Sequence, residues 1–287
     1  MNSLKDIVNE VFSEAGASEA SGNDFVGEDG LLYCGKCGTK KETRIRFPAA
    51  GGKTETKTVP CVCKCRQEEL EELRKAEEYR EKQQRISSIR QSSLIETKFK
   101  KARLLDYTVT NDNRRVFDLA QKYVSGFQEM YRENQGILFW GEVGTGKSHT
   151  AACIANELIE HMHTVIMTSF VKILQDFQTM KVDEGAWIKK LQEAELLIID
   201  DLGTERNTEY ALEKVYNVID SRYRSGKPLI LTTNLALKDM IHTTDIRYRR
   251  IYDRIFEMCY PVHVKGSSYR EAEAARRFDT MQKILES

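Results

Sequence analysis

The chain has 287 residues, enough for one large domain and a smaller one. Hydrophobic residues make up 40% and charged residues 31%, a composition that supports a hydrophobic core. The 44 Lys and Arg residues balance 44 Asp and Glu residues, which excludes a global basic field and leaves only a local patch for nucleic acid. No signal peptide is evident, and no stretch approaches the roughly 20 apolar residues of a membrane span, so a cytoplasmic protein without a membrane partner is predicted.

Residues 1–15 carry an apolar stripe at helical spacing, which predicts an amphipathic helix. Two roles for it stay open: docking into a groove of a partner protein, or covering the small module that follows. The stripe consists of Leu4, Ile7, Val8, Val11 and Phe12.

Five of the seven cysteines lie between positions 34 and 65, which is metal-site spacing rather than a scattered disulfide framework. Gly35 and Gly38 permit a tight turn in which backbone N–H groups can face metal-bound sulfur. Four thiolates are the usual ligands of a structural Zn²⁺, and metal binding would supply folding energy to so small a module. The sequence predicts a zinc site within residues 1–65, formed by the first two cysteines and two of the last three. Which two of the last three bind the metal stays open. The candidate ligands are Cys34, Cys37, Cys61, Cys63 and Cys65.

Residues 66–93 are rich in Glu, Lys, Arg and Gln and contain neither Gly nor Pro, which predicts a charged helical linker. From residue 94 to 287, short apolar runs alternate with amphipathic helical patterns. This alternation predicts an α/β fold in which a five-stranded parallel sheet is covered by helices. The predicted strands are Gly136–Trp140, Thr164–Thr168, Leu196–Asp200, Pro228–Thr233 and Met258–Val264. The predicted helices span 147–161, 170–180, 208–225 and 245–257.

The segment between the first of these strands and the following helix reads GEVGTGKS and matches G-x-x-x-x-G-K-S/T in full. Such a loop turns successive N–H groups toward the phosphates of ATP or ADP at the positive end of a helix. Lys147 is predicted to reach the β and γ phosphates, and Ser148 to ligate Mg²⁺. The predicted nucleotide-binding residues are Gly141, Glu142, Val143, Gly144, Thr145, Gly146, Lys147, Ser148 and His149.

Two carboxylates follow a buried strand at Asp200 and Asp201. Asp200 is the predicted Mg²⁺ partner, and Asp201 the base that orients the attacking water, with Glu205 as an alternative base. Either Thr233 or Asn234, at the end of another apolar strand, is predicted to touch the γ-phosphate or that water.

Arginines recur at i, i+3 and i+7 in one predicted helix, at Arg247, Arg250 and Arg254. The spacing alone favours a solvated basic face. A rigid, permanently charged guanidinium also suits a transition-state phosphate, so a catalytic contact is the second interpretation.

Five segments in this order, GEVGTGKSH, LLIIDDLGTE, PLILTTNL, RRIYDRIFE and GSSYR, resemble the DnaC-type replicative helicase loaders and the related IstB-like transposition helper ATPases, both AAA+ proteins. The resemblance covers about Leu94 to Arg270. It implies that the strand ending at Asn234 lies between the two other nucleotide-binding strands, with Asn234 as a sensor-1 residue. It also implies that Arg254 is an arginine finger acting on a neighbouring subunit's ATP, with Arg250 as a second candidate, and that Arg270 is a sensor-2 arginine.

The resemblance further implies self-assembly into a spiral around single-stranded DNA and action on a hexameric replicative helicase gripped by the N-terminal region. Phe170 and Lys172, at the start of a helix, are candidates for stacking on a base and contacting a phosphate, although a core role for Phe170 is the commoner outcome. A transposition helper ATPase is the alternative function. A nucleotide-gated DNA-binding switch with little turnover is another, because Asp201 stands where many relatives have Glu.

Overall fold

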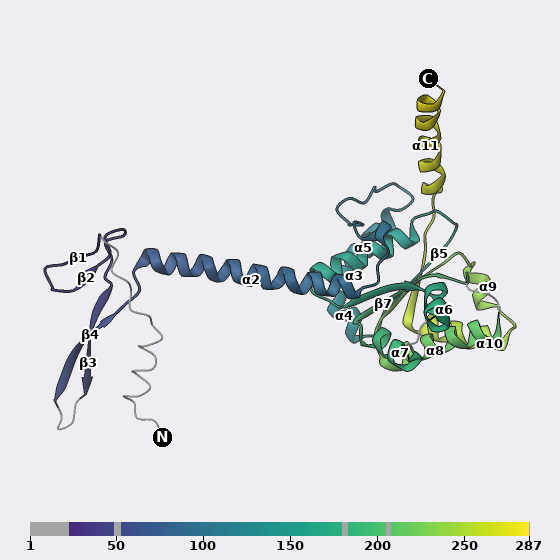
Figure 1. The fold of residues 1–287 in the computed structure, drawn as a ribbon. Coiled ribbons are helices and arrows are strands. Elements are labelled where there is room, and N and C mark those ends of the chain that lie inside the picture. The colour runs from purple at the N-terminus through teal and green to yellow at the C-terminus, as the bar shows by residue number, and fades with distance from the viewer. Residues whose placement is uncertain (1–22, 49–52, 180–182, 205–207, 287) are drawn as a thin grey trace. The chain divides into compact units, whose positions relative to one another are not determined.

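The structure is a computed structural model that describes residues 23–48, 53–179, 183–204 and 208–286. The chain divides into two compact units, Met1–Gln83 and Gln84–Ser287 (Figure 1). The amphipathic stripe predicted for residues 1–15 lies outside the described residues, as does Glu205. None of the described helices combines the length and apolar composition needed to cross a bilayer.

The N-terminal unit contains two small antiparallel sheets rather than a layered core. Strands β1 (Phe25–Val26) and β2 (Leu32–Tyr33) form one, and β3 (Glu42–Pro48) and β4 (Thr54–Pro60) form a longer hairpin. The alternating threonines of β4 favour an extended strand, because a β-branched side chain packs well on a pleated surface. This hairpin occupies most of the spacer between the two cysteine groups and was not predicted.

Helix α2 (Lys64–Ser92) corresponds to the predicted charged linker helix. Pairs at i,i+3 and i,i+4 stabilise its exposed surface, including Arg66–Glu69 at 2.8 Å and Lys75–Glu71 at 2.9 Å. The boundary between the two compact units falls inside this helix, so the domain limits at residues 65 and 93 stay predictions.

The C-terminal unit is built on a five-stranded parallel sheet in the order β6-β7-β8-β5-β9, which confirms the predicted fold class. Strand β8 lies between β7 and β5, the two strands that lead into the Asp pair and the phosphate loop. The implied position of the strand before Asn234 is therefore confirmed. The strands are β5 (Gly136–Trp140), β6 (Val165–Ser169), β7 (Leu196–Leu202), β8 (Leu229–Thr233) and β9 (Cys259–His263).

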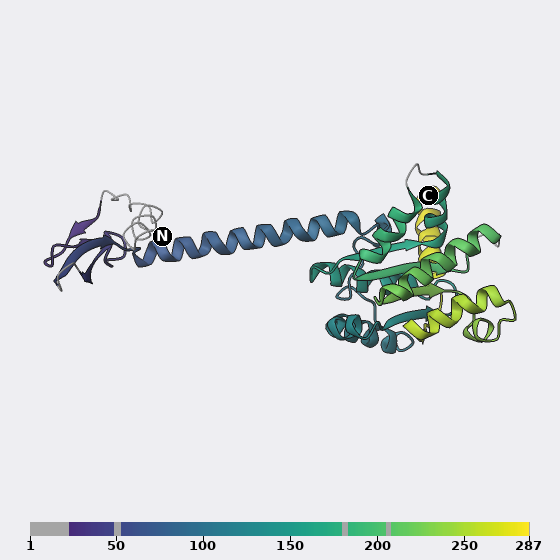
Figure 2. The ribbon, with the colours of Figure 1, turned by 90° about the horizontal axis from the view of Figure 1, so that it is seen from below.

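Helices cover both faces of this sheet, as Figures 1 and 2 show. Helices α5, α6, α8 and α10 were predicted; the others were not. The helices are a 3-10 turn η1 (Thr97–Phe99), α3 (Arg114–Ser125), α4 (Phe127–Arg132), α5 (Lys147–Glu160), α6 (Phe170–Thr179), α7 (Glu184–Glu193), α8 (Glu209–Ser225), α9 (Leu237–Ile241), α10 (Ile246–Met258) and α11 (Tyr269–Leu285).

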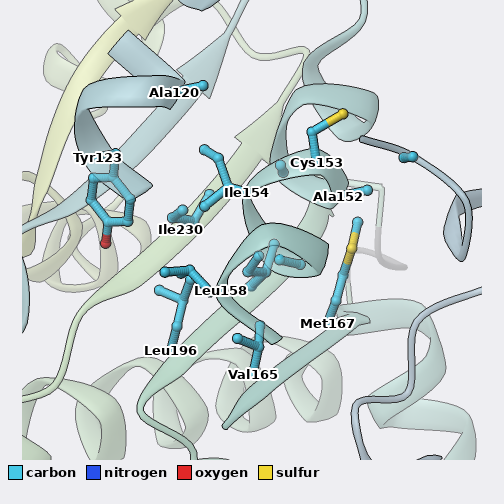
Figure 3. Packing of buried hydrophobic residues seen from close by; sticks show 14 of the residues in the cluster. Ala120, Tyr123, Ala152, Cys153, Ile154, Leu158, Val165, Met167, Leu196 and Ile230 are labelled. Atoms are coloured by element: carbon cyan, nitrogen blue, oxygen red, sulfur yellow. The ribbon is translucent and has the colours of Figure 1, made fainter. Parts of the chain in front are cut away.

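The strand alternation divides the buried residues between two apolar clusters, one on each face of the sheet. In β7, Leu196 and Ile198 belong to the cluster under α3 and α5, and Leu197 and Ile199 belong to the one under α6, α7, α8 and α10. Figure 3 shows the first cluster, in which Ile154 and other side chains of α5 lie against the strands. Cys153 and Cys259 are both fully buried and act as small core residues.

One large polar side chain, Arg222 of α8, is buried in this unit with 1% of its surface exposed. Its guanidinium donates to five backbone carbonyls, at Leu191, Gln192, Ala194, Glu195 and Pro228, over 2.6–3.3 Å. Burial lowers the pKa of Arg222 to about 10. The side chain satisfies carbonyls at the C-terminal end of α7, which have no partner inside that helix.

Candidate nucleotide-binding site

The phosphate loop connects β5 to α5 and depends on three glycines with positive φ, Gly141 (+139°), Gly144 (+83°) and Gly146 (+97°). A Cβ on Gly144 would lie 2.2 Å from the Ser268 hydroxyl, so this position has no room for a side chain. Gly146 immediately precedes α5, whose first N–H groups have no partner within the helix and are directed toward the loop. The local backbone therefore forms a concavity of the kind that binds anions in other proteins.

Lys147 is 4% exposed, and its Nζ donates to the carbonyls of Gly141 at 2.9 Å and Glu142 at 2.6 Å. Burial lowers the pKa of Lys147, and the nearby charges of Asp201 and Asp200 oppose that shift. The ammonium group is thus held inside the loop, beside the two carboxylates.

A break in strand pairing brings both of these carboxylates to the same edge of the sheet. The register between β7 and β8 shifts between Ile199 and Leu202, and Asp201 has a φ of +56°, which is rare for a residue other than glycine. Successive residues of a regular strand point to opposite faces, and a bulge re-aims one of them. Burial raises the pKa of Asp201, and the charge of Asp200 raises it further.

Thr232, fully buried in β8, holds this bulge and was missed by the sequence analysis. Its Oγ1 donates to Oδ1 of Asp200 at 2.6 Å and accepts from the backbone N–H of Asp201 at 2.9 Å. Thr233 is also buried, and its hydroxyl donates to the carbonyl of Leu202 at 2.8 Å. Of the two residues proposed for the γ-phosphate, the exposed Asn234 is therefore the one that reaches the cavity.

A cavity of about 350 Å³ lies above the phosphate loop. It brings together most of the predicted site: Val143, Gly144, Gly146, Lys147, Ser148, His149, Asp201, Asn234 and Arg270. Gly141, Glu142, Thr145 and Asp200 do not line the cavity. Five further lining residues were not predicted: Phe99, Asp106, Tyr107, Thr108 and Tyr269. The cavity thus combines polar and charged groups with aromatic rings.

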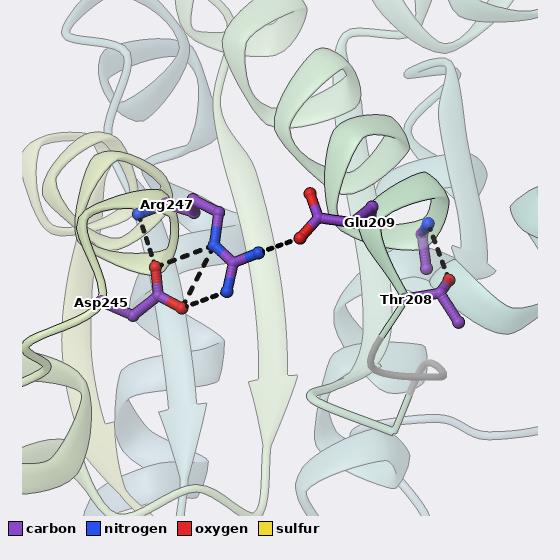
Figure 4. Close-up of polar contacts among 5 residues, drawn as sticks. Thr208, Glu209, Asp245 and Arg247 are labelled. Carbon is purple, nitrogen blue, oxygen red and sulfur yellow. Dashed lines mark hydrogen bonds and ion pairs between the residues drawn. The ribbon is translucent and has the colours of Figure 1, made fainter.

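None of the three α10 arginines lines this cavity. Arg254 is 23% exposed; its Nη2 lies 2.6 Å from Asp220, and its guanidinium lies 4.8 Å from the ring centre of Tyr216. Arg247 pairs with Asp245 and with Glu209 of α8 (Figure 4). Arg250 is exposed. A nucleotide contact from this face would therefore have to be made with another chain.

The proposed stacking role of Phe170 is wrong. Its ring is 1% exposed and packs in the apolar cluster with Ile173, so no face is available to a base. The core role that the sequence also allowed is confirmed, and Lys172 alone, half-buried on α6, keeps access to solvent.

In the N-terminal unit the sulfur atoms of Cys34, Cys37, Cys63 and Cys65 lie within 4.8 Å of one another. The Cys34–Cys65 and Cys63–Cys65 sulfur separations are 3.6 and 3.4 Å, near the roughly 3.8 Å edge of a tetrahedron with Zn–S bonds of about 2.3 Å. Cys61 stands apart from them and donates to the carbonyl of Lys40. Of the three later cysteines, the structure thus brings Cys63 and Cys65 together with Cys34 and Cys37.

The ionisation of these thiols also fits a cation. Backbone N–H groups of Cys37 and Lys36 lower the pKa of Cys34, and the hydroxyl of Thr39 lowers that of Cys37 to about 5. The neighbouring thiols of Cys63 and Cys34 raise the pKa of Cys65 to about 12. Four clustered sulfurs cannot all ionise without a compensating charge, and a divalent metal supplies one.

A parallel sheet with the strand order β6-β7-β8-β5-β9, a phosphate loop after β5 and an Asp pair near the end of β7 defines an AAA+ P-loop protein. The profile of the family described as "IstB-like ATP binding protein" matches residues 62–276, well over half of the chain. The chain belongs to this family of ATP-binding proteins.

Individual relatives match more loosely. The chain is 31% identical over 164 residues to the phage-like element PBSX protein XkdC of Bacillus subtilis, covering 54% of this chain and 60% of that protein. It is 28% identical over 140 residues to the replicative helicase loader DnaC of Escherichia coli, covering 47% and 55%. A crystal structure of DnaI shares the fold with a TM-score of 0.54 at 21% identity, covering 62% of this chain and 98% of that one.

Proposed function

We propose that this protein is an ATP-dependent loader that places a hexameric, ring-shaped replicative helicase on single-stranded DNA. The observation that carries the proposal is the cavity that joins Lys147, Asp201, Asn234 and Arg270 in one AAA+ unit. Relatives named as replicative helicase loaders, at 26–28% identity, supply the biological role.

In the proposed site the loop N–H groups and Lys147 hold the phosphates of ATP. Ser148 and Asp200 would hold Mg²⁺, which neutralises charge on the phosphates when it is bound. Asp201, with its raised pKa, accepts the proton of the attacking water and orients it, and Asn234 fixes that water or the γ-phosphate. Thr232 keeps the two carboxylates in their separate roles, because it is hydrogen-bonded to the side chain of one and the backbone of the other.

Arg270 would contact the γ-phosphate within the same chain, since it lines the cavity. Arg254 would contact the nucleotide of a neighbouring chain in a spiral assembly, with Arg250 as the second candidate. A guanidinium delivered in this way stabilises the charge of the transition state, so hydrolysis depends on assembly.

The N-terminal unit would hold Zn²⁺ through Cys34, Cys37, Cys63 and Cys65, without Cys61. The metal is structural in this proposal, because four thiolates leave no open coordination position. This unit is assigned the grip on the helicase.

A transposition helper is the second candidate, favoured by the family description, IstB-like. A nucleotide-gated DNA-binding switch with little turnover is the third, favoured by the shorter Asp at position 201. The three differ in partner and in turnover, so the test has to measure both.

The deciding experiment mixes the protein with the hexameric replicative helicase of its host, with and without ATP, on circular single-stranded DNA coated with single-strand binding protein. A loader increases the helicase retained on the circle and hydrolyses ATP, and Lys147→Ala abolishes both effects. No complex under any nucleotide condition would contradict the loader and direct the search to a transposase. DNA binding that depends on ATP without turnover would favour the switch.

A further inference from the structure

Asn113, at the start of α3, connects two walls of the nucleotide cavity. Its side chain is buried at 2% exposure, and Nδ2 donates to the carbonyl of Thr108 at 2.9 Å and to the hydroxyl of Tyr269 at 2.7 Å. Its Oδ1 accepts from the backbone N–H of Thr110 at 2.7 Å. Both amide protons and the oxygen are thus used, which fixes the side chain in one orientation.

Tyr269 is the other half of this contact and touches the phosphate loop as well. Its backbone N–H donates to the carbonyl of Gly144 at 3.0 Å, and its ring lies 3.6 Å from the position that a Cβ on Gly146 would occupy. The next residue, Arg270, lines the cavity. Tyr269 is therefore held by the loop through its backbone and by Asn113 through its hydroxyl, directly before the arginine.

The rest of α11 provides little to fix that arginine. None of its described side chains is buried, and Phe278, Met281 and Ile284 are 72%, 47% and 63% exposed. The start of the helix is positioned instead by Ser268, whose side chain lies against Gly144, and by the contacts of Tyr269. Loss of one of these contacts should therefore move Arg270 more than it disturbs the core.

The residues joined by Asn113 suit different parts of a nucleotide. Lys147, Ser148 and Asp201 suit phosphates and a metal ion, whereas the rings of Tyr107 and Phe99 suit a base, and all five line one cavity. Thr108, whose carbonyl binds Asn113, follows Tyr107 directly, and the hydroxyl of Tyr107 lies 2.8 Å from that of Thr150 in α5. The Asn113 amide thus links the segment that carries Tyr107 to the residue that precedes Arg270.

We propose that the Asn113–Tyr269 hydrogen bond is a positioning contact that holds Arg270 in the nucleotide cavity, so that the preference of the cavity for a nucleoside triphosphate over a diphosphate depends on it. The inference rests on the assignment of the cavity to ATP in the proposed function. Asn113 and Tyr269 act through Arg270, not on the reacting atoms.

The test measures dissociation constants of the full chain for ATPγS and for ADP, both with Mg²⁺, by calorimetry. Tyr269→Phe keeps the ring and removes only the hydroxyl. It should weaken ATPγS binding by about two- to tenfold, the range for one lost hydrogen bond, and leave ADP binding nearly unchanged. Arg270→Ala should weaken ATPγS binding by about tenfold or more, because a charged partner is lost. In the Arg270→Ala background, Tyr269→Phe should add nothing, because the two residues act as one unit.

Tyr123→Phe is the matched control. It removes a different phenol hydroxyl, which donates to the carbonyl of Gln135 at 3.1 Å outside the cavity, and should leave the ratio of ATPγS to ADP affinity unchanged. Asn113→Ala, checked for an intact melting transition, should reproduce the ratio of Tyr269→Phe. If Tyr269→Phe weakens ATPγS and ADP binding equally, or if its effect adds fully to that of Arg270→Ala, the positioning role is overturned and the proposed function is not. A wild-type chain that binds neither nucleotide overturns the proposed function as well.

Discussion

The two compact units of this protein are stabilised in different ways. The C-terminal unit has two apolar clusters packed on a parallel sheet. Among the described residues of the N-terminal unit, the only buried apolar or sulfur side chains are Leu31, Cys34, Val59 and Cys63. So few buried groups cannot offset the entropy of ordering the chain. The comparison indicates that burial specifies the C-terminal unit, and it supports the proposal that a metal held by the four cysteines stabilises the N-terminal one.

Replacing a proposed metal ligand should give the largest difference in stability between the two units. Structural zinc contributes about 10–16 kcal/mol to the folding of small zinc peptides, so Cys34→Ser should unfold the N-terminal unit while the C-terminal unit keeps its melting transition. Zinc content by mass spectrometry and limited trypsin digestion measure the two effects. Cys61→Ser, the matched control, should retain zinc, because its thiol bonds only to a backbone carbonyl. Loss of zinc in both variants would contradict the four-cysteine assignment.

Replacing Arg254 of α10 tests whether ATP turnover by the larger unit needs a second chain. Arg254→Ala should lower ATP turnover by about 1,000-fold and preserve ATP binding, since an arginine finger acts on the transition state. Turnover should recover when Arg254→Ala chains are mixed with Asp201→Asn chains, which supply the arginine but not the base. Arg254→Lys, which can keep the ion pair with Asp220, controls for a loss of folding. Full turnover in Arg254→Ala would contradict the role in trans.

Arg222 is a buried charged side chain in the larger unit, and replacing it measures how far the stability of that unit depends on its contacts with backbone carbonyls. Arg222→Met leaves buried carbonyls at the end of α7 without donors. It should lower the free energy of unfolding by about 3–5 kcal/mol in urea titrations. Arg224→Met, two residues away on the exposed surface, should change it by no more than about 0.5 kcal/mol. Equal effects would show that the carbonyl contacts of Arg222 contribute little.

Replacing Asp201 should have a smaller effect, raising the stability of the protein while lowering its ATP turnover. Its folded pKa lies above 3.8, so the folded state binds the proton more tightly than the unfolded state, and ionisation at neutral pH costs stability. Asp201→Asn should therefore be more stable than wild type at pH 7, with the gain vanishing as the pH falls toward 3.8. Turnover should fall about 100-fold, because the base is lost. A variant less stable than wild type at pH 7 would contradict the cost assigned to burying the Asp201 carboxylate.

Periodicity made the sheet predictable. All five strands have apolar runs bounded by polar residues, and Asp200 and Asn234 each follow such a run at the carboxyl edge where ligands bind. The predicted end of β7 at Asp200 was too early by two residues, because a bulge continues the strand to Leu202. Bulges depend on pairing with a neighbouring strand, here through Thr232, and a single strand's pattern does not contain that information.

Contacts between distant segments could not be predicted either. Asn113 and Tyr269 are 156 positions apart, and neither has a motif that indicates the other. In the N-terminal unit, the cysteine spacing indicated a metal site, but the fifth cysteine was excluded only by the positions of the sulfurs. The threonine alternation in Thr54–Pro60 was the available signal for the hairpin, and it is short enough to be taken for a spacer.

The most direct test of this division of labour uses Cys34→Ser/Cys37→Ser and Lys147→Ala in the full chain. Helicase retention is measured in pull-downs, and ATPγS affinity by calorimetry. The cysteine variant should bind ATPγS like wild type and fail to retain the helicase. Lys147→Ala should lose ATPγS binding, whereas its N-terminal unit should retain zinc. Helicase retention by a zinc-free cysteine variant, or loss of ATPγS binding in that variant, would contradict the assignment of partner binding to one unit and nucleotide chemistry to the other.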